Sequence, residues 1–137
     1  MPRNRRFGLD TSVVLRLLTG EPEPQAERAA QFLVEALDSG DWLIVSDLVI
    51  CEAYFALHTH YEVPKREAID ILAQMLTEGP VQAVDGSPVL NVLKASAKGS
   101  QKPGFVDRLI QAQYEALKAE TVSFEKASRR LPRTQVL

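Results

Sequence analysis

Residues 5–20 read RRFGLDTSVVLRLLTG. The first part of this stretch, Arg5 to Leu9, predicts a short strand. Asp10-Thr11-Ser12 then offers the side chains that commonly cap the N-terminus of a helix. The run Val13 to Thr19 predicts a short helix, which ends at Gly20. A strand followed at once by a helix is the repeating unit of an α/β fold.

The rest of the chain continues this alternation of strands and helices. Strands are predicted for residues 42–45, 81–84 and 121–124, and helices for 25–38, 63–79, 88–97, 104–119 and a segment capped by Ser46 that runs to about His60. A short basic helical turn follows the last of these strands. The pattern predicts an α/β fold with a parallel sheet. In such sheets, functional sites lie outside the carboxyl ends of the strands.

The size and composition are those of one globular domain. The chain has 137 residues, of which 45% are hydrophobic and 25% charged, so we expect residues 1–137 to form a single domain. The single cysteine, Cys51, excludes an intramolecular disulfide and fits a reducing compartment. No stretch of about 18 apolar residues is present, so we expect no membrane span and a cytoplasmic protein.

The charge is divided unevenly along the chain. The net charge is −2, but residues 1–93 carry 7 basic and 14 acidic side chains, whereas residues 94–137 carry 9 basic and 4 acidic ones. A protein that binds nucleic acid by bulk charge is usually basic throughout. A basic C-terminal region could still attract phosphates, although a solvated surface of uneven composition is the simpler interpretation.

Two acidic residues directly follow predicted strands. Asp10 comes after the first strand and Glu125 after the strand at residues 121–124. Both therefore stand at the sheet edge where α/β proteins keep their sites. For Asp10, capping of the helix that follows is an equally reasonable structural role.

Two further acids lie on predicted helices. Glu52 is the only charged residue from Leu48 to Leu57, and a buried carboxylate needs a cation, a proton or a partner such as Arg16. Asp107 lies in the first turn of the helix that begins at Gly104, where an acid also stabilises the helix dipole.

Together these four carboxylates suggest a site for a hard cation. Clustered carboxylates repel one another unless a cation lies between them, and oxygen ligands select Mg²⁺ or Mn²⁺. Such a metal polarises a phosphoryl oxygen and activates water. Carboxylates beside a basic rim therefore suggest hydrolysis of phosphodiesters.

Five stretches of the chain form a recognisable set of motifs: FGLDTSVVLRLLTG at residues 7–20, QAERA at 25–29, LVICEA at 48–53, GFVDRLI at 104–110 and TVSFEK at 121–126. Together they resemble the PIN-domain ribonucleases, and more narrowly the VapC toxins of bacterial toxin–antitoxin pairs. The resemblance covers nearly the whole chain, in the order and spacing of the family. It departs from the family at Glu125, where an aspartate is usual.

This resemblance implies a single three-layer α/β/α domain with a central parallel sheet flanked by helices. It also implies an endoribonuclease that depends on Mg²⁺ or Mn²⁺, a homodimer, and a cognate antitoxin whose C-terminal segment lies over the acidic site. Asp10, Glu52 and Asp107 would hold the metal and its water, and Glu125, with its longer side chain, would complete the catalytic set less securely.

Polar residues around these acids have implied supporting roles. Thr11, Ser12 and Ser123 match polar positions of the motifs and would orient carboxylates or waters. The candidate contacts to RNA phosphates are Arg16, Lys98, Lys102 and Arg108. The same four side chains could instead contact the antitoxin or the carboxylates.

Other function classes remain open at this stage. A PIN-like fold with a compromised metal site could bind RNA or a protein without cleaving it, and Glu125 motivates this alternative. Phosphatases of the haloacid dehalogenase type and receiver domains also place an aspartate after the first strand. The phosphatases require a second aspartate where this chain has Ser12. The receiver domains require acids where it has Gly8 and Leu9, so neither family matches this sequence well.

Overall fold

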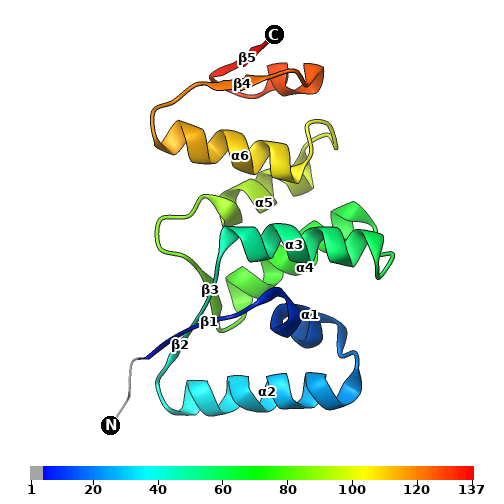
Figure 1. Cartoon of the computed structure of the whole chain (residues 1–137), viewed down its shortest axis with the longest axis vertical. Helices are drawn as coiled ribbons and strands as arrows, with labels where there is room; N and C mark the ends of the chain where they lie inside the picture. The colour runs from blue at the N-terminus through cyan, green and yellow to red at the C-terminus, as the bar shows by residue number, and fades with distance from the viewer. Residues whose placement is uncertain (1–4) are drawn as a thin grey trace. The chain divides into compact units, whose positions relative to one another are not determined.

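The computed structural model describes residues 5–137, and its chain divides into two units between Asp85 and Gly86 (Figure 1). The first unit contains a parallel sheet and four helices. Its elements are β1 (Arg6–Gly8), α1 (Thr11–Thr19), α2 (Glu23–Asp38), β2 (Trp42–Val45), α3 (Asp47–Thr59), α4 (Lys65–Glu78) and β3 (Val81–Ala83). The strand order is β1-β2-β3, which places β2 in the centre of this sheet.

Local sequence signals set the ends of the helices in this unit. Gly20 adopts a φ of 73°, and its N–H donates to the carbonyl of Arg16 at 2.9 Å, which ends α1. At the start of α3, the Ser46 hydroxyl accepts a hydrogen bond from the N–H of Val49 at 3.2 Å. Both boundaries were predicted from the sequence and are confirmed.

One face of the three-stranded sheet forms the core of the first unit. Leu43, Val45 and Val81 point to this face and are almost completely buried. The helix α2 packs on β2, and α4 packs on β3 and against α3 (Figure 1). The other face is more open, since Trp42 at its edge is 48% exposed. The alternation follows from the two-residue period of a strand.

The second unit combines two helices with a small parallel sheet. Its elements are α5 (Val89–Lys98), α6 (Phe105–Ala116), β4 (Thr121–Ser123), the 3-10 helix η1 (Lys126–Arg130) and β5 (Thr134–Val136). The strands β4 and β5 pair in parallel, and η1 forms the crossover between them and packs on β5. Leu93, Phe105 and Leu109 are buried in this unit, as α5 packs on α6.

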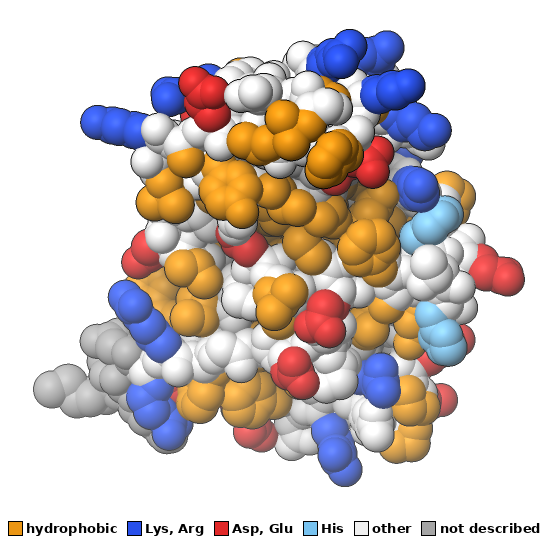
Figure 2. Space-filling view, turned by 45° about the horizontal axis from the view of Figure 1, so that its top comes forward, with side chains coloured by type: hydrophobic (Ala, Val, Ile, Leu, Met, Phe, Trp, Pro, Cys, Tyr) orange, Lys and Arg blue, Asp and Glu red, His pale blue; other side chains and the backbone are white. Residues whose placement is uncertain are grey.

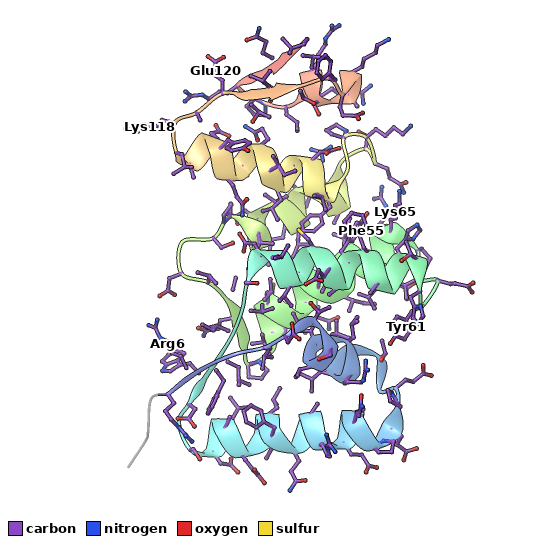
Figure 3. The ribbon with its side chains drawn as sticks, viewed as in Figure 1. Arg6, Phe55, Tyr61, Lys65, Lys118 and Glu120 are labelled. Carbon is purple, nitrogen blue, oxygen red and sulfur yellow. The ribbon has the colours of Figure 1, made fainter. Side chains whose placement is uncertain are left out.

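The prediction of an α/β fold with parallel strands is confirmed, with three differences in detail. The strands are shared between two sheets, one in each unit. The strand β5 was not predicted. The helix α6 ends at Ala116, three residues early, because Lys118 takes a φ of 61° that a helix does not allow. Lys118 and Glu120 lie in the connection to β4 (Figure 3).

In the part of the chain that the structure describes, no helix is both long and apolar enough to cross a lipid bilayer.

Candidate active site

Asp10 lies at the carboxyl end of β1, and its carboxylate has no partner among the described residues. Its backbone carbonyl accepts hydrogen bonds from the N–H groups of Val13 and Val14, at 3.1 and 3.2 Å, and so begins α1. Its side chain makes no capping bond and is exposed. Among residues 5–137 the carboxylate has no hydrogen bond or ion pair. The capping alternative for this side chain is therefore wrong.

Glu52 is held beside the start of α1 by a hydrogen bond between distant residues. The hydroxyl of Thr11 donates to Oε1 of Glu52 at 3.0 Å, across 41 positions of sequence. Because Thr11 directly follows Asp10, this bond brings the Glu52 carboxylate to the end of β1. One oxygen of Glu52 accepts this bond, and its other oxygen is open to a ligand.

The expectation that Glu52 is buried is wrong. Glu52 is exposed, as are Leu48, at 70%, and Phe55, at 50%, which lie one turn before and after it on α3; Phe55 is labelled in Figure 3. The buried side of α3 carries Ile50, Ala53, Tyr54 and Leu57. The helix is thus apolar on more than its core side, so its hydrophobic run did not reveal which side faces inward.

Arg16 is not the partner of Glu52. Its Nε donates to Oε1 of Gln25, on α2, at 2.7 Å, and this is its contact among the described residues. The ion pair considered between Arg16 and Glu52 is therefore absent from residues 5–137.

The second unit carries the other two acids. Asp107 lies in the first turn of α6 and is exposed. Glu125 is exposed at the start of η1, where its backbone N–H donates to the Ser123 hydroxyl at 2.9 Å. Within the described chain, neither carboxylate has a hydrogen bond or an ion pair. Both are therefore available to a cation.

The described residues do not form a complete metal site. No group of three or more His, Cys, Asp or Glu side chains that could hold a metal is found among residues 5–137. Within the first unit, the arrangement supplies the Glu52 carboxylate, which Thr11 holds, and the carboxylate of Asp10, the residue before Thr11. Their oxygen donors suit Mg²⁺ or Mn²⁺, which bind through one or two carboxylates and retain several waters.

The basic residues considered for contact with RNA phosphates differ in how many hydrogen bonds they already make within the protein. Arg108 donates from Nε to the carbonyl of Pro103 at 3.0 Å and from Nη2 to that of Ser100 at 3.2 Å, so it holds the loop before α6. Gly99 leaves room for this guanidinium, because a Cβ there would lie 3.1 Å from Nη2. By contrast, Lys98 and Lys102 are exposed, and lysines and arginines stand out on this unit in Figure 2.

A pocket of about 590 Å³ in the first unit was not foreseen from the sequence. Residues of β1, α1 and α2 line it, and we call it the α1–α2 pocket. Ser12 and Leu9, which flank the Asp10-Thr11 pair, belong to its lining, as do Arg16 and Arg28. Arg28 falls on the polar side of its helix, a pattern typical of a solvated residue, so only the folded structure shows its role in the pocket.

Cys51, next to Glu52, has a thiol with a raised pKa. Burial, together with the negative charge of Asp47, raises the pKa of its thiol. The thiol therefore stays mostly protonated near neutral pH.

Comparison with known proteins identifies the family. Residues 8–134 match the model of the PIN domain family. None of the curated proteins matches the sequence.

Proposed function

The chain belongs to the PIN domain family, whose members are generally metal-dependent nucleases, and from this premise we propose that it is an endoribonuclease. The substrate is RNA, and the reaction is hydrolysis of its phosphodiester bonds in the presence of Mg²⁺ or Mn²⁺. The observation that carries the proposal is the Asp10 and Glu52 pair at the carboxyl end of β1. Its carboxylates are exposed and have no basic partner in the described chain.

The donor set fits a hard divalent cation. Asp10, Glu52 and Asp107 would hold it, and Glu125 would complete the set. When bound, the cation would polarise a phosphoryl oxygen and activate a water. Thr11 orients Glu52 through its hydroxyl and directly follows Asp10 in the chain. Ser12 and Ser123 are proposed to orient carboxylates or waters in the same way.

The resemblance of the motifs to VapC toxins supports a more specific role. We infer that the protein is the toxin of a toxin–antitoxin pair, acts in the cytoplasm as a homodimer, and forms one PIN domain over residues 1–137. The antitoxin would cover the acidic site. Exposed apolar side chains on α3, Leu48 and Phe55, support contact with another polypeptide.

A non-cleaving binding module is the second candidate. The observation that favours it is Glu125, which stands where the family usually has aspartate. Its extra methylene moves the carboxylate by about 1.5 Å, one carbon–carbon bond. If this displacement impairs the metal site, the protein would bind RNA or a partner without cutting.

Metal-dependent cleavage of RNA tests the main proposal. The purified chain, free of antitoxin, is incubated with total RNA with and without Mg²⁺ or Mn²⁺, and Asp10→Asn runs beside it. Asp70→Asn, which removes an exposed acid from α4, is the matched control. We expect discrete fragments that require metal and vanish only with Asp10→Asn. Circular dichroism checks that all three proteins are folded.

Two outcomes contradict this function. Cleavage that persists without metal would exclude the mechanism. Absence of fragments from a folded protein that binds metal would favour the binding module. The Glu125→Asp variant then distinguishes a compromised nuclease from a protein that only binds. A large gain of cleavage in Glu125→Asp would show that the natural site is compromised.

A further inference from the structure

The α1–α2 pocket has a composition that differs from the unit around it. Residues 1–85 carry 7 basic and 14 acidic side chains. Yet two arginines, Arg16 and Arg28, line this pocket, and none of its described lining residues is an aspartate or glutamate. Two guanidinium groups that line one pocket without an acid favour a negatively charged ligand there.

The two guanidinium groups have donors to spare. Nε of Arg16 donates to the side-chain oxygen of Gln25 at 2.7 Å, which orients the guanidinium and leaves its two terminal nitrogens without a described partner. Arg28 has no hydrogen bond or ion pair within residues 5–137. A guanidinium group whose N–H donors are free can bind two phosphate oxygens at once.

The apolar wall of the pocket is aromatic. The rings of Phe7 and Phe32 pack edge to face, with centroids 5.1 Å apart. The guanidinium carbon of Arg5 lies 5.0 Å from the centroid of Phe7, so Phe7 already has a cationic neighbour. Phe32 is 39% exposed and still offers ring surface to a ligand. Unpaired RNA bases stack on such rings.

The pocket also lies next to the proposed reaction site. Leu9 and Ser12 line it, and these residues flank Asp10 and Thr11. Thr11 in turn holds Glu52. A ligand in the pocket therefore lies on the same unit as this carboxylate pair and within a few residues of it. The volume of about 590 Å³ falls in the usual range of small-molecule pockets.

We propose that the α1–α2 pocket binds one nucleotide of single-stranded RNA, with its base against Phe32 and its phosphate between Arg16 and Arg28. This inference rests on the proposed function, because it takes RNA as the substrate. The pocket positions the chain relative to Asp10 and Glu52 and selects unpaired RNA, since a base held within a duplex cannot stack on Phe32.

Binding without cleavage tests the pocket. The probe is a fluorescein-labelled single-stranded RNA hexamer of mixed sequence, and its anisotropy is measured with the full chain in EDTA. We expect Arg28→Gln to raise the Kd about tenfold, and to lower the salt dependence by about 0.7 in log–log slope, the value for one phosphate contact on a single strand. Phe32→Leu should raise the Kd about tenfold and leave the slope unchanged, because it removes stacking alone.

Lys65→Gln is the matched control. Lys65 is exposed at the start of α4 (Figure 3), lies outside the pocket, and carries the same charge as Arg28. We expect its Kd to stay within about twofold of the parent protein. Equal Kd values for Arg28→Gln, Phe32→Leu and Lys65→Gln would overturn the proposal, and so would absence of RNA binding by the folded parent.

An acidic protein segment is the competing occupant. A labelled peptide of alternating glutamate and leucine serves as its probe. If Arg28→Gln and Phe32→Leu weaken this peptide and leave the RNA unaffected, the pocket is a protein-docking site and the RNA proposal is wrong. Because EDTA removes the metal, RNA binding that depends on the pocket can persist when cleavage fails. Conversely, if Arg28→Gln and Phe32→Leu cleave RNA as fast as the parent protein and bind it equally well, the proposed nuclease function stands and the proposed role of the pocket is wrong.

Discussion

Several arginines of the two units differ in what they contact. In the first unit, which is acidic, Arg16 and Arg28 line a pocket that contains no acid. In the second unit, which is basic, Arg108, Arg130 and Arg133 donate to backbone carbonyls of nearby loops. Arginines used in this way hold the backbone and have fewer donors left for a ligand.

This difference shows that net charge does not locate the cations available for binding. A guanidinium has five N–H donors, and each carbonyl that it satisfies removes one from a ligand's reach. Several arginines of the basic C-terminal region therefore hold loops in place, and these have fewer N–H groups free to bind a ligand. The acidic region nevertheless supplies the Asp10 and Glu52 carboxylates and the two arginines that line the α1–α2 pocket.

The largest expected effect concerns whether the second unit shares in catalysis. Asp107→Asn should lower RNA cleavage at least about 100-fold, as Asp10→Asn should, because the proposed function has both carboxylates hold the metal, and loss of a metal ligand costs more than loss of a residue that orients one. Single-turnover cleavage rates with Mg²⁺ provide the measurement. Glu115→Gln, an exposed acid on the same helix, is the control. Full activity of Asp107→Asn would confine the site to the first unit.

A smaller effect is expected from the bond that joins α1 to α3. Thr11→Ala removes the donor to Glu52 and should reduce Mn²⁺ affinity or cleavage about 10- to 100-fold, because groups that orient metal ligands contribute on that scale. Calorimetric titration with Mn²⁺ and cleavage rates measure it. Thr11→Ser keeps the hydroxyl and should restore most of the loss. Equal behaviour of the Ala and Ser variants would show that the hydroxyl has no such role.

The contrast between arginines predicts an effect on stability. Arg108→Ala removes two charged hydrogen bonds from the loop before α6 and should lower the free energy of unfolding by about 2 kcal/mol. Arg28→Gln in the first unit should change it by less than about 0.5 kcal/mol. Urea denaturation followed by circular dichroism compares the two. A similar loss of unfolding free energy in both variants would show that Arg108 and Arg28 do not differ in their structural role.

The smallest effect concerns the thiol beside the acid pair. Because burial and Asp47 raise the pKa of Cys51, less thiolate is present at pH 8 than for a free cysteine. We expect iodoacetamide to alkylate Cys51 several-fold more slowly than a model thiol, and the rate to increase as the pH is raised. Mass spectrometry over a time course measures this. Alkylation as fast as that of the model thiol would show that the thiol is not protected.

Local patterns in the sequence predicted most of the secondary structure. The helix boundaries at Gly20 and Ser46 were predicted correctly because caps act over three or four residues. The strand β5 was missed because it has three residues and depends on pairing with β4. Strand pairing is a long-range event that composition does not reveal.

Among the site residues, position along the chain was a better guide than polarity. The place of Asp10 after the first strand was read directly from the sequence. The burial of Glu52 was misjudged, because its apolar neighbours suggested a core helix although Leu48 and Phe55 are exposed with it. A helix that is apolar on several sides does not indicate which side the rest of the protein covers.

By itself the sequence determined the alternation of strands and helices, the strand-end position of Asp10 and the uneven distribution of charge. These depend on residues a few positions apart, or on counting. Only the tertiary structure decided that Thr11 meets Glu52, that Arg108 serves a loop, and that Arg16 and Arg28 share a pocket. Such contacts join segments that are distant in sequence or set by side-chain direction, and packing alone brings them together.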